Sequence, residues 1–574
     1  MISNNIEAGS MLALDLGNFT TRASLIDVVD GQYRLIAAGE ARTTAGAPYF
    51  DVRTGVVSAV RQIEQVIDRQ LVDHKGTMIM PVQVSGHGFD SLVIVYSCVP
   101  EMKIAVAGLV NEISLESAQH LVSGLYGKTV ETAALLDQRD TASLVDAILR
   151  QEPELIILTG GTENGAVRSV GKLTQLAQTI CQFTRRDEAP EVLYAGNSRL
   201  AEQVKRNLEM HTRVQVADNI RPSAEVEALA PARLTLEGIA FQHARRNVNG
   251  FSGLTDPCSS IPMQTASGMS LLTQMIHEIK GANRPVLGVD IGAVYSSVSL
   301  VRRKRLMDVT LPLGTGWGLD SLLQDGKVEE FAKWVPPSVS VSRILDVLSQ
   351  KAVYPQIQPV SEEMTDIEQA VLRVILRTLL QNLQSRWRTP ASTFEPILLS
   401  GKPLTSINPP GAALMVALDG LQPSGITTIL RDPHGLVPVL GAAGKINPII
   451  PVQLFDSGAL DHLATTICPV SRASLGTPIL QVKLTDESGK EEELVVKQGA
   501  LVVLPIRFNQ VVKVHVQGLH GTMVDPLTRT ASATLMITGG LCGAVIDARG
   551  RPLILPKESA DRWDRIDKWR KVFG

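Results

Sequence analysis

Cysteine is scarce in this chain, with five among 574 residues, and no two cysteines form a C-x-x-C pair. The ten histidines are also dispersed and make no H-E-x-x-H pattern. Spacings typical of metal sites are therefore absent. A small, odd number of scattered cysteines favours a reducing compartment over a disulfide framework, so we expect the protein to be cytoplasmic.

Long apolar runs and an excess of one charge are lacking as well. No apolar stretch reaches the length needed to cross a bilayer. The opening residues, MISNNIEAGS, contain no basic segment followed by an apolar one, so no signal peptide is predicted. The formal net charge of -3 gives no general attraction to nucleic acid or to an anionic membrane. We therefore expect neither nucleic acid binding nor membrane insertion.

What the chain does have is a regular alternation of apolar runs and helical patterns. Continuous apolar runs such as SLVIVYSC (91–98) and ELIILTGG (154–161) predict buried strands. Segments such as 55–73, where apolar residues recur three and four positions apart, predict helices. Strands alternating with helices indicate the α/β class with a largely parallel sheet.

One stretch near the N-terminus occurs twice. LALDLGNFTTRASLI (12–26) aligns without a gap with LGVDIGAVYSSVSLV, 275 positions further on. The alignment matches Asp15 with Asp290 and Gly17 with Gly292. Because each copy starts an α/β segment, the sequence predicts two related domains.

Each copy has the features of a hairpin that binds phosphate. A glycine lets the backbone approach an anion closely, and turn amides and hydroxyl groups can donate to phosphate oxygens. A carboxylate at the strand end can hold hydrated Mg2+. The sequence therefore predicts a site for ATP and Mg2+, with Asp15 and Asp290 as metal ligands. The predicted nucleotide-binding residues are Asp15, Gly17, Asn18, Thr20, Thr21, Gly160, Gly161, Gly292, Ser296, Ser297, Gly401 and Gly441.

Gly401 and Gly441 are included in the predicted site because of the adenosine, and Glu163 is added because of hydrolysis. Gly401 in LLSGKPL and Gly441 in LGAAG are interpreted as glycines after strands, where an adenosine can lie against the backbone. Hydrolysis needs a general base that positions water, and Asp15, Glu163 and Asp290 are the candidates. For Glu163, in GGTENG, capping of the following helix is an equal alternative.

Changes in composition predict the domain boundaries. After Pro451, strand-like segments alternate with turns rich in Gly, Asp and Lys, which indicates a separate, mainly β domain. Within it, DARGRP predicts a tight turn with an ion pair from Asp547 to Arg549 or Arg551. The predicted segments are a first domain at 10–240, a linker and helix at 241–284, a second domain at 285–450 and the β domain at 452–574.

These motifs resemble those of the actin, sugar-kinase and heat-shock-chaperone superfamily of ATPases, and within it those of the glutamate mutase L (MutL) proteins. The matching stretches are LALDLGNFTTRASLID, VAGLVNEISLESAQH, PELIILTGGTENG, VLYAGNSRLAEQV with VADNIRP, and VLGVDIGAVYSSVSLV. The resemblance covers about residues 10–450, and GGTENG and AGN are its most distinctive parts. It implies two actin-like ATPase (ribonuclease H-like) domains that close on ATP. It also implies a chaperone or reactivating factor for an adenosylcobalamin-dependent mutase.

The second hairpin departs from the usual family pattern, D-I-G-G-A-T-T-D. Ala293 replaces a glycine, Tyr295 and Ser296 replace threonines, and Ser297 replaces an aspartate. Alanine cannot always adopt glycine torsions, and the lost carboxylate removes a candidate ligand of Mg2+. The first hairpin is better kept, with Arg22 where lysine is common. Nucleotide binding is thus better supported than efficient hydrolysis, and a slow and a degenerate ATPase both stay open.

Three functional hypotheses follow. The first is an ATP-dependent accessory factor with a cobalamin-dependent mutase as partner. The second is a non-hydrolysing actin-like scaffold or assembly protein whose C-terminal β domain binds a partner. A small-molecule kinase is less well supported, because no acceptor-site aspartate among polar residues can be identified. A homodimer is left open.

Overall fold

The computed structural model describes residues 9–573 except 136–138, 164, 166, 186–187, 282–283, 325–327 and 487. The chain divides into two compact units. Unit 1 holds the described residues up to Thr43, then Gly55–Val95 and those from Thr265 onward, while unit 2 holds Thr44–Thr54 and Tyr96–Gln264. Both copies of the sequence repeat therefore belong to unit 1, and the predicted 10–240 segment divides between the two units.

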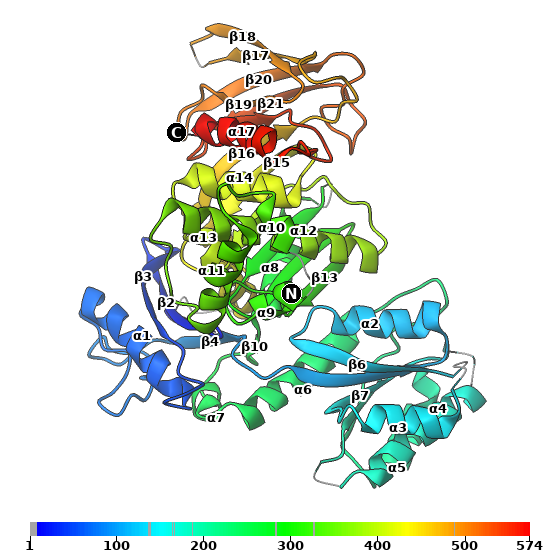
Figure 1. Cartoon of the computed structure of the whole chain (residues 1–574). Coiled ribbons are helices and arrows are strands. Elements are labelled where there is room, and N and C mark those ends of the chain that lie inside the picture. The colour runs from blue at the N-terminus through cyan, green and yellow to red at the C-terminus, as the bar shows by residue number, and fades with distance from the viewer. Residues whose placement is uncertain are drawn as a thin grey trace. The chain divides into compact units, whose positions relative to one another are not determined.

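The first sheet of unit 1 starts with an antiparallel meander. The meander consists of β1 (Met11–Leu16), β2 (Thr20–Val29) and β3 (Gln32–Arg42), and β4 (Ser91–Tyr96) lies next to β1, in the order β4-β1-β2-β3. Figure 1 labels β2, β3 and β4. All residues of β1 are buried except Asp15, which is partly exposed. Helix α1 (Val52–Ile67) packs closely on β3, because a Cβ on Gly39 would lie 2.0 Å from the carbonyl oxygen of Ala59. The apolar run thus makes a buried strand with one carboxylate at its end.

The second sheet of unit 1 has eight strands in the order β13-β12-β11-β14-β15-β16-β22-β19. They are β11 (Val286–Ile291), β12 (Ser296–Arg302), β13 (Arg305–Leu311), β14 (Ile397–Ser400), β15 (Gly425–Arg431), β16 (Asp461–Cys468), β19 (Leu501–Leu504) and β22 (Ala544–Asp547). Strand β14 lies parallel to both β11 and β15, whereas β11–β12 and β15–β16 are antiparallel. The predicted boundary after Pro451 therefore falls inside one hydrogen-bonded sheet.

Helices cover the strands of unit 1. They are α8 (Thr265–Ile279), α9 (Leu319–Gln324), α10 (Val328–Ala332), α11 (Val341–Val353), α12 (Glu362–Arg386), α13 (Lys402–Thr405), α14 (Pro410–Leu421), α15 (Leu436–Ile446), α16 (Ile449–Asp456) and α17 (Ser559–Arg570). Helices α8 and α15 cross at two glycines, since a Cβ on Gly441 would lie 1.9 Å from the carbonyl oxygen of Gly268. Larger residues at either position would force these two helices apart.

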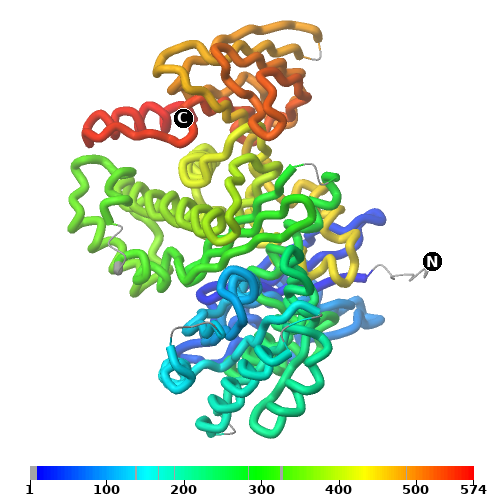
Figure 2. Tube along the Cα trace, turned by 90° about the vertical axis from the view of Figure 1, so that its right-hand side faces the viewer, coloured from blue at the N-terminus to red at the C-terminus, as the bar shows by residue number. Residues whose placement is uncertain are grey.

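The C-terminal part of unit 1 contains a separate antiparallel sheet in the order β18-β17-β20-β21. Its strands are β17 (Pro478–Thr485), β18 (Glu491–Lys497), β20 (Val511–Gly518) and β21 (Ser532–Thr538). Alternate residues such as Leu480, Val482 and Val514 form its core. Figure 2 shows these strands in orange, with α17 in red beside them. The mainly β character predicted for this region is confirmed.

Buried ion pairs tie the C-terminal strands to α12 and α14. Asp547 accepts from Arg549 (Nε–Oδ1 2.8 Å) and from Arg551 (NH2–Oδ2 2.6 Å). Arg549 also pairs with Asp419 at 2.7 Å, and Asp419 pairs with Arg373 at 2.8 Å. The side chains of Asp547, Arg549 and Asp419 are fully buried. The ion pair predicted from DARGRP is thus confirmed with both arginines.

Unit 2 is a doubly wound domain around a five-stranded, all-parallel sheet in the order β6-β5-β7-β8-β9. Its elements are β5 (Met102–Gly108), α2 (Glu116–Val122), β6 (Gly127–Ala134), α3 (Thr141–Leu149), β7 (Leu155–Leu158), α4 (Val167–Phe183), β8 (Glu191–Tyr194), α5 (Ala201–Leu208), β9 (Val214–Val216), α6 (Ala230–Asn247), α7 (Phe251–Thr255) and β10 (Met263–Gln264). Helices α3, α4 and α5 cover one face of the sheet and α2 and α6 the other.

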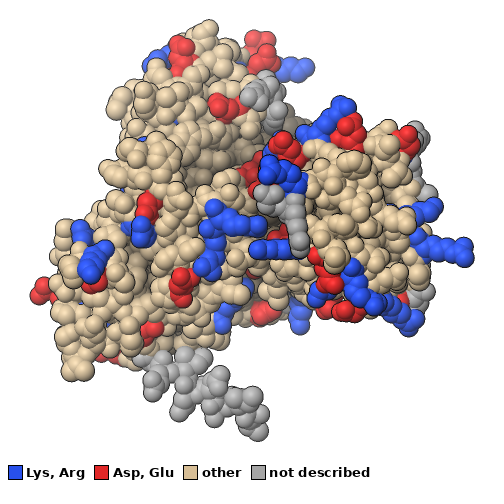
Figure 3. Space-filling model, turned by 90° about the horizontal axis from the view of Figure 1, so that it is seen from below, with Lys and Arg blue, Asp and Glu red and all other residues tan. Residues whose placement is uncertain are grey.

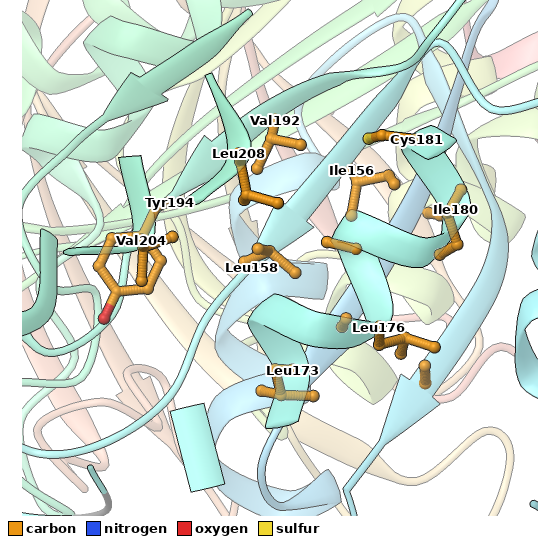
Figure 4. Packing of buried hydrophobic residues seen from close by; sticks show 14 of the residues in the cluster. Ile156, Leu158, Leu173, Leu176, Ile180, Cys181, Val192, Tyr194, Val204 and Leu208 are labelled. Carbon is orange, nitrogen blue, oxygen red and sulfur yellow. The ribbon is translucent and has the colours of Figure 1, made fainter. Parts of the chain in front are cut away.

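Figure 4 shows the packing on the first of these faces. Leu173, Leu176 and Ile180 of α4 lie against Ile156 and Leu158 of β7 in one buried cluster. In a sheet of this kind, the loops after the carboxyl ends of the strands carry the polar residues that bind ligands. The GGTENG motif is the loop that follows β7.

The surface and the helices add two general observations. On the face drawn in Figure 3, basic and acidic side chains are interspersed. Within the described part of the chain, no helix combines the length and apolar character that crossing a membrane requires. The five cysteines are all free thiols.

Candidate functional site

The first copy of the repeat forms a hairpin between β1 and β2, called hairpin 1. Asp15 lies opposite Arg22 across the two strands. The amide of Gly17 donates to the carbonyl oxygen of Thr20 at 3.0 Å. A Cβ on Gly17 would lie 2.6 Å from that same oxygen. The turn therefore requires glycine, because no side chain fits at this position without a shift of the backbone.

The second copy forms hairpin 2, between β11 and β12, with the same geometry. Asp290 lies opposite Ser297. The amide of Gly292 donates to the carbonyl oxygen of Tyr295 at 2.9 Å, and a Cβ on Gly292 would lie 2.8 Å from it. The duplicated sequence thus produces a duplicated turn, in spite of its altered side chains.

The two aspartates belong to two rows of side chains that run across neighbouring strands. Row 1 consists of Glu40 on β3, Arg22 on β2 and Asp15 on β1. Row 2 consists of Ser297 on β12, Asp290 on β11 and Ser400 on β14. Because residues paired across adjacent strands point to the same face of a sheet, each row gathers its side chains on one face.

Two contacts show that the hairpins lie close together within unit 1. Phe19, in the turn of hairpin 1, meets the ring of Trp317 edge-on, with ring centroids 6.1 Å apart. Trp317 belongs to a glycine-rich segment, 314–318, that lies on hairpin 2. Lys402, at the start of α13, forms an ion pair with Glu40 of row 1. Side chains from both sheets therefore meet at this place.

A third aspartate, Asp432, stands beside row 2. Its carboxylate accepts from the hydroxyl of Ser400 at 3.0 Å and from the amides of Leu436 and Val437 at 2.8 Å each. It therefore caps the first turn of α15, and it is buried. This capping carboxylate lies near Asp290 and helps to raise the pKa of Asp290.

Burial is the largest cause of the raised pKa of both hairpin aspartates. It raises the pKa of Asp15 to about 6, opposed by the charge of Arg22 and by a hydrogen bond from Thr265. It raises the pKa of Asp290 to about 7, assisted by the negative charge of Asp15 and opposed by Arg22. Both side chains still reach solvent in part. The site thus places carboxylates close together with too little positive charge, which favours a proton or a cation between them.

The hydroxyl groups of the two hairpins have different surroundings. The hydroxyl of Thr21 is buried and bonds with that of Thr43 at 2.9 Å. Ser296 donates to the carbonyl oxygen of Leu313 at 2.6 Å. Ser297 is also buried, but its Oγ has no hydrogen-bond partner among the described residues. An unsatisfied buried hydroxyl beside Asp290 is costly unless a ligand or water completes it.

Each turn is held by the segment that follows the third strand of its sheet. Thr43 donates its amide to the carbonyl of Phe19 at 2.9 Å and its hydroxyl to the carbonyl of Gly17 at 2.7 Å. In hairpin 2, the amides of Gly316 and Gly318 donate to the carbonyl of Ala293 at 3.0 and 2.9 Å. The sequence prediction did not include this segment, although the spacing of the glycines in GTGWG could have indicated it.

Gly401 and Gly441 are the two predicted nucleotide-binding glycines of unit 1 that lie outside the hairpins. Gly401 follows β14 as expected, with φ +88°, and a Cβ there would lie 2.1 Å from the carbonyl oxygen of Ile291. Gly441 was expected after a strand, and this placement is wrong, because it lies inside α15. The segment LGAAG is apolar all round because α15 is buried on all sides. A short continuous apolar run of this kind resembles a buried strand. The crossing with Gly268 accounts for the glycine.

Gly160, Gly161 and Glu163 form a separate polar cluster in unit 2, in the loop after β7. Both glycines have left-handed backbone torsions, with φ +131° and +79°. The carboxylate of Glu163 accepts from Asn219 at 2.7 Å and from the hydroxyl of Ser198. Burial by itself would raise the pKa of Glu163. The hydrogen bonds together have the larger effect and hold the pKa below its ordinary value. A carboxyl group with a lowered pKa is a weaker base than Asp290.

We expect Glu163→Ala to destabilise unit 2 rather than to stop a reaction. The change removes the acceptor of Asn219 and Ser198, and losing such a partner costs about 1–3 kcal/mol. Thermal unfolding and phosphate release measured on the same samples would test this, with Glu209→Ala, an exposed residue just after α5, as the control. A loss of phosphate release with unchanged unfolding would instead support Glu163 as a base.

No group of three or more His, Cys, Asp or Glu side chains in an arrangement suited to a metal ion occurs among the described residues. The predicted ligands Asp15 and Asp290 therefore supply at most part of a coordination shell. This pattern fits Mg2+, which keeps several waters and shares its remaining ligands with phosphate.

Together, the hairpins, the two sheets that they head and the crossing helices define an α/β protein, as the sequence predicted. The family model described as MutL protein matches residues 11–458. The chain therefore belongs to the MutL protein family, which confirms the family recognised from its motifs. Comparison with curated proteins finds no match.

Three of the solved structures similar to this chain share little sequence identity with it. Nucleotide-free acetone carboxylase is 11% identical, with 86% of this chain and 81% of that chain covered and a TM-score of 0.32. ATP-dependent caprolactamase from Pseudomonas jessenii is 10% identical, with 85% and 81% covered and a TM-score of 0.32. Component A of (R)-2-hydroxyglutaryl-CoA dehydratase from Acidaminococcus fermentans is 8% identical, with 77% and 98% covered and a TM-score of 0.27.

Proposed function

We propose that this protein binds ATP with Mg2+ at the two hairpins of unit 1. The observation that carries the proposal is the meeting of two duplicated Asp-x-Gly hairpins inside one compact unit, close enough for Asp15 to raise the pKa of Asp290. Paired carboxylates of this kind suit a hydrated divalent cation, and tight glycine turns suit phosphate oxygens.

The residues of the site fit such a ligand. Asp15 and Asp290 would hold Mg2+ through its waters, and the unpartnered Oγ of Ser297 could donate to a phosphate oxygen or to a water. Arg22 supplies a positive charge that acts on both aspartates. When bound, Mg2+ would offset the negative charge of the carboxylates and of the phosphates.

Hydrolysis, if it takes place, is slow in this proposal. The turn of hairpin 2 carries Ala293 and a buried Tyr295, and segment 314–318 occupies its carbonyl groups. Those features leave less freedom for the turn to rearrange around a reacting phosphate. Asp290 is the candidate base, because it lies partly buried at the end of hairpin 2 beside Asp15 and Ser297.

The cellular role in this proposal follows from the family alone. A MutL protein would act as a chaperone or reactivating factor of an adenosylcobalamin-dependent mutase, with nucleotide binding as its switch. The alternative, a non-hydrolysing scaffold whose C-terminal β region binds a partner, is favoured by the altered hairpin 2. The two differ in whether phosphate is released.

Calorimetry with Mg-ATP, Mg-ADP and a non-hydrolysable analogue, paired with a phosphate-release assay, tests the proposal. Binding of all three with slow release supports the accessory ATPase, and binding without release supports the scaffold. The absence of heat with every nucleotide would overturn both.

Asp290→Asn is expected to lower any phosphate release by about 100-fold, the usual contribution of a general base. Asp30→Asn is the matched control, because Asp30 is exposed in the β2–β3 turn at φ 51°, where asparagine is well tolerated. Equal release rates in the two variants would exclude Asp290 as the base.

A further inference from the structure

Glu40 is the outermost member of row 1 and bonds with two cations at once. Its Oε2 accepts from the Nε of Arg22 at 3.3 Å, on the neighbouring strand. Its Oε1 forms an ion pair with the Nζ of Lys402, the first residue of α13, which follows β14 of the other sheet of unit 1. Burial alone would raise the pKa of Glu40, but the hydrogen bonds and charges of Lys402 and Arg22 hold it below its ordinary value.

Both cations stand beside the groups that the proposed nucleotide would meet. Arg22 lies opposite Asp15 and acts on the charge of both hairpin aspartates. Gly435, before α15, gives it room, because a Cβ there would lie 2.4 Å from NH1 of Arg22. Lys402 directly follows Gly401, whose position is in contact with the last residue of β11.

The charges around the hairpin aspartates do not suit a triphosphate while Glu40 is in place. The carboxylates of Asp15 and Asp432 act on Asp290, and Glu40 engages both Arg22 and Lys402. A polyphosphate would need these cations, since charge-assisted bonds from Arg and Lys are the usual contacts of phosphate oxygens. Glu40 and a phosphate therefore compete for the same partners.

The Glu40 contacts are of a kind that a ligand can replace. The side chain of Glu40 is 39% exposed and that of Lys402 is 44% exposed. Ion pairs at such exposed positions contribute only about 0–1 kcal/mol. Arg22, by contrast, is 15% exposed and is held in place by the strand pairing of row 1.

We propose that Arg22 and Lys402 are the phosphate-binding cations of this site and that Glu40 occupies them until a nucleotide polyphosphate replaces it. The inference rests on the proposed nucleotide binding and adds that Glu40 competes with the nucleotide for Arg22 and Lys402. A ligand with several phosphate charges displaces Glu40 more readily than one with a single charge, so the site selects polyphosphates. When Glu40 is displaced, the link that it makes between the two sheets through Lys402 opens.

The test compares the dissociation constants of Glu40→Gln and Lys402→Met with that of the whole wild-type protein, using Mg-ATP and Mg-ADP in calorimetry. Glu40→Gln is expected to bind Mg-ATP about fivefold more tightly, because an ion pair of about 1 kcal/mol no longer competes. Lys402→Met is expected to bind it about fivefold more weakly. Glu491→Gln, which removes another exposed glutamate–lysine pair in the C-terminal sheet, is the matched control and should bind as the wild type does.

Three results would overturn the inference in different ways. If the wild type binds Mg-ATP and Glu40→Gln binds equally or more weakly, Glu40 positions the cations and does not compete for them. If Lys402→Met binds as tightly as the wild type, Lys402 does not contact phosphate. If the wild type itself binds no nucleotide, the proposed function fails, and the inference fails with it.

Discussion

Replacing Gly17 with valine should abolish measurable Mg-ATP binding. A Cβ at this position would lie 2.6 Å from the carbonyl oxygen of Thr20, which is backbone and cannot move aside cheaply. The turn would have to open, and the amide of Gly17 would lose its 3.0 Å hydrogen bond to that oxygen. Asp15 and Asn18 lie on either side of this turn. Opening the turn would therefore move both residues away from the proposed phosphate position. We expect affinity to fall by roughly 100-fold or more, equivalent to about 3 kcal/mol.

The measurement is calorimetry with Mg-ATP, together with circular dichroism to show that the fold persists. Gly171→Val in α4 is the matched control, because a Cβ there meets no atom within 4 Å. It introduces the same residue where the Cβ meets no atom, far from hairpin 1 in sequence, and should leave nucleotide affinity unchanged. An unaltered dissociation constant for Gly17→Val would show that hairpin 1 does not contact the phosphates.

Replacing Asp547 with asparagine should cause a large loss of stability. Asp547 is fully buried and shares its two oxygens between Arg549 and Arg551. Without its charge, two arginines would stay buried with only Asp419 as a counter-ion to Arg549. Breaking a buried pair in this way costs about 3–5 kcal/mol, because the remaining charge is left uncompensated.

The same network sets the pH dependence of this contribution. Burial opposes the charge of Asp547, but Arg549 and Arg551 outweigh it and depress the pKa of Asp547 far below its ordinary value. A carboxyl group with a depressed folded-state pKa stabilises the fold fully above its unfolded pKa and loses that stabilisation as the pH falls through the folded one. The contribution of Asp547 is thus complete at neutral pH and fades only in strong acid.

Denaturant unfolding at neutral pH measures the effect. Asp567→Asn is the control, because Asp567 forms an exposed pair with Lys571 on α17, and such pairs contribute about 0–1 kcal/mol. A loss for Asp547→Asn no greater than for the control would mean that the buried arginines find other partners or water.

The hairpins were predictable because they are local. Their strands and turn lie within about fifteen consecutive residues, so the alternation of apolar and polar residues and the position of Gly17 determine pairing and turn together. The repeat therefore identified both hairpins, although Tyr295 and Ala293 differ from the residues usual there. The ion pair of Asp547 was predictable for the same reason, since its partners follow within four residues.

Other parts of the candidate site were missed or misplaced because they depend on contacts that are distant in sequence. Glu40 and Lys402 are 362 positions apart, and nothing near either residue indicates their pairing. Asp432 precedes a helix whose apolar run resembles a strand, so its capping role is not visible in the sequence. The placement of Gly441 after a strand was wrong because a helix buried on all sides shows no amphipathic period.

By itself, the sequence determined the α/β class, the family, the two Asp-x-Gly turns and the buried ion pair of the C-terminal strands. Each of these is encoded by residues that are neighbours along the chain. Only the tertiary structure decided that both hairpins belong to one unit and GGTENG to another, and that Asp15, Asp290, Arg22, Glu40 and Lys402 share one place. Electrostatic coupling depends on distance in space and on burial, and folding sets both through strand pairings that a linear pattern does not specify.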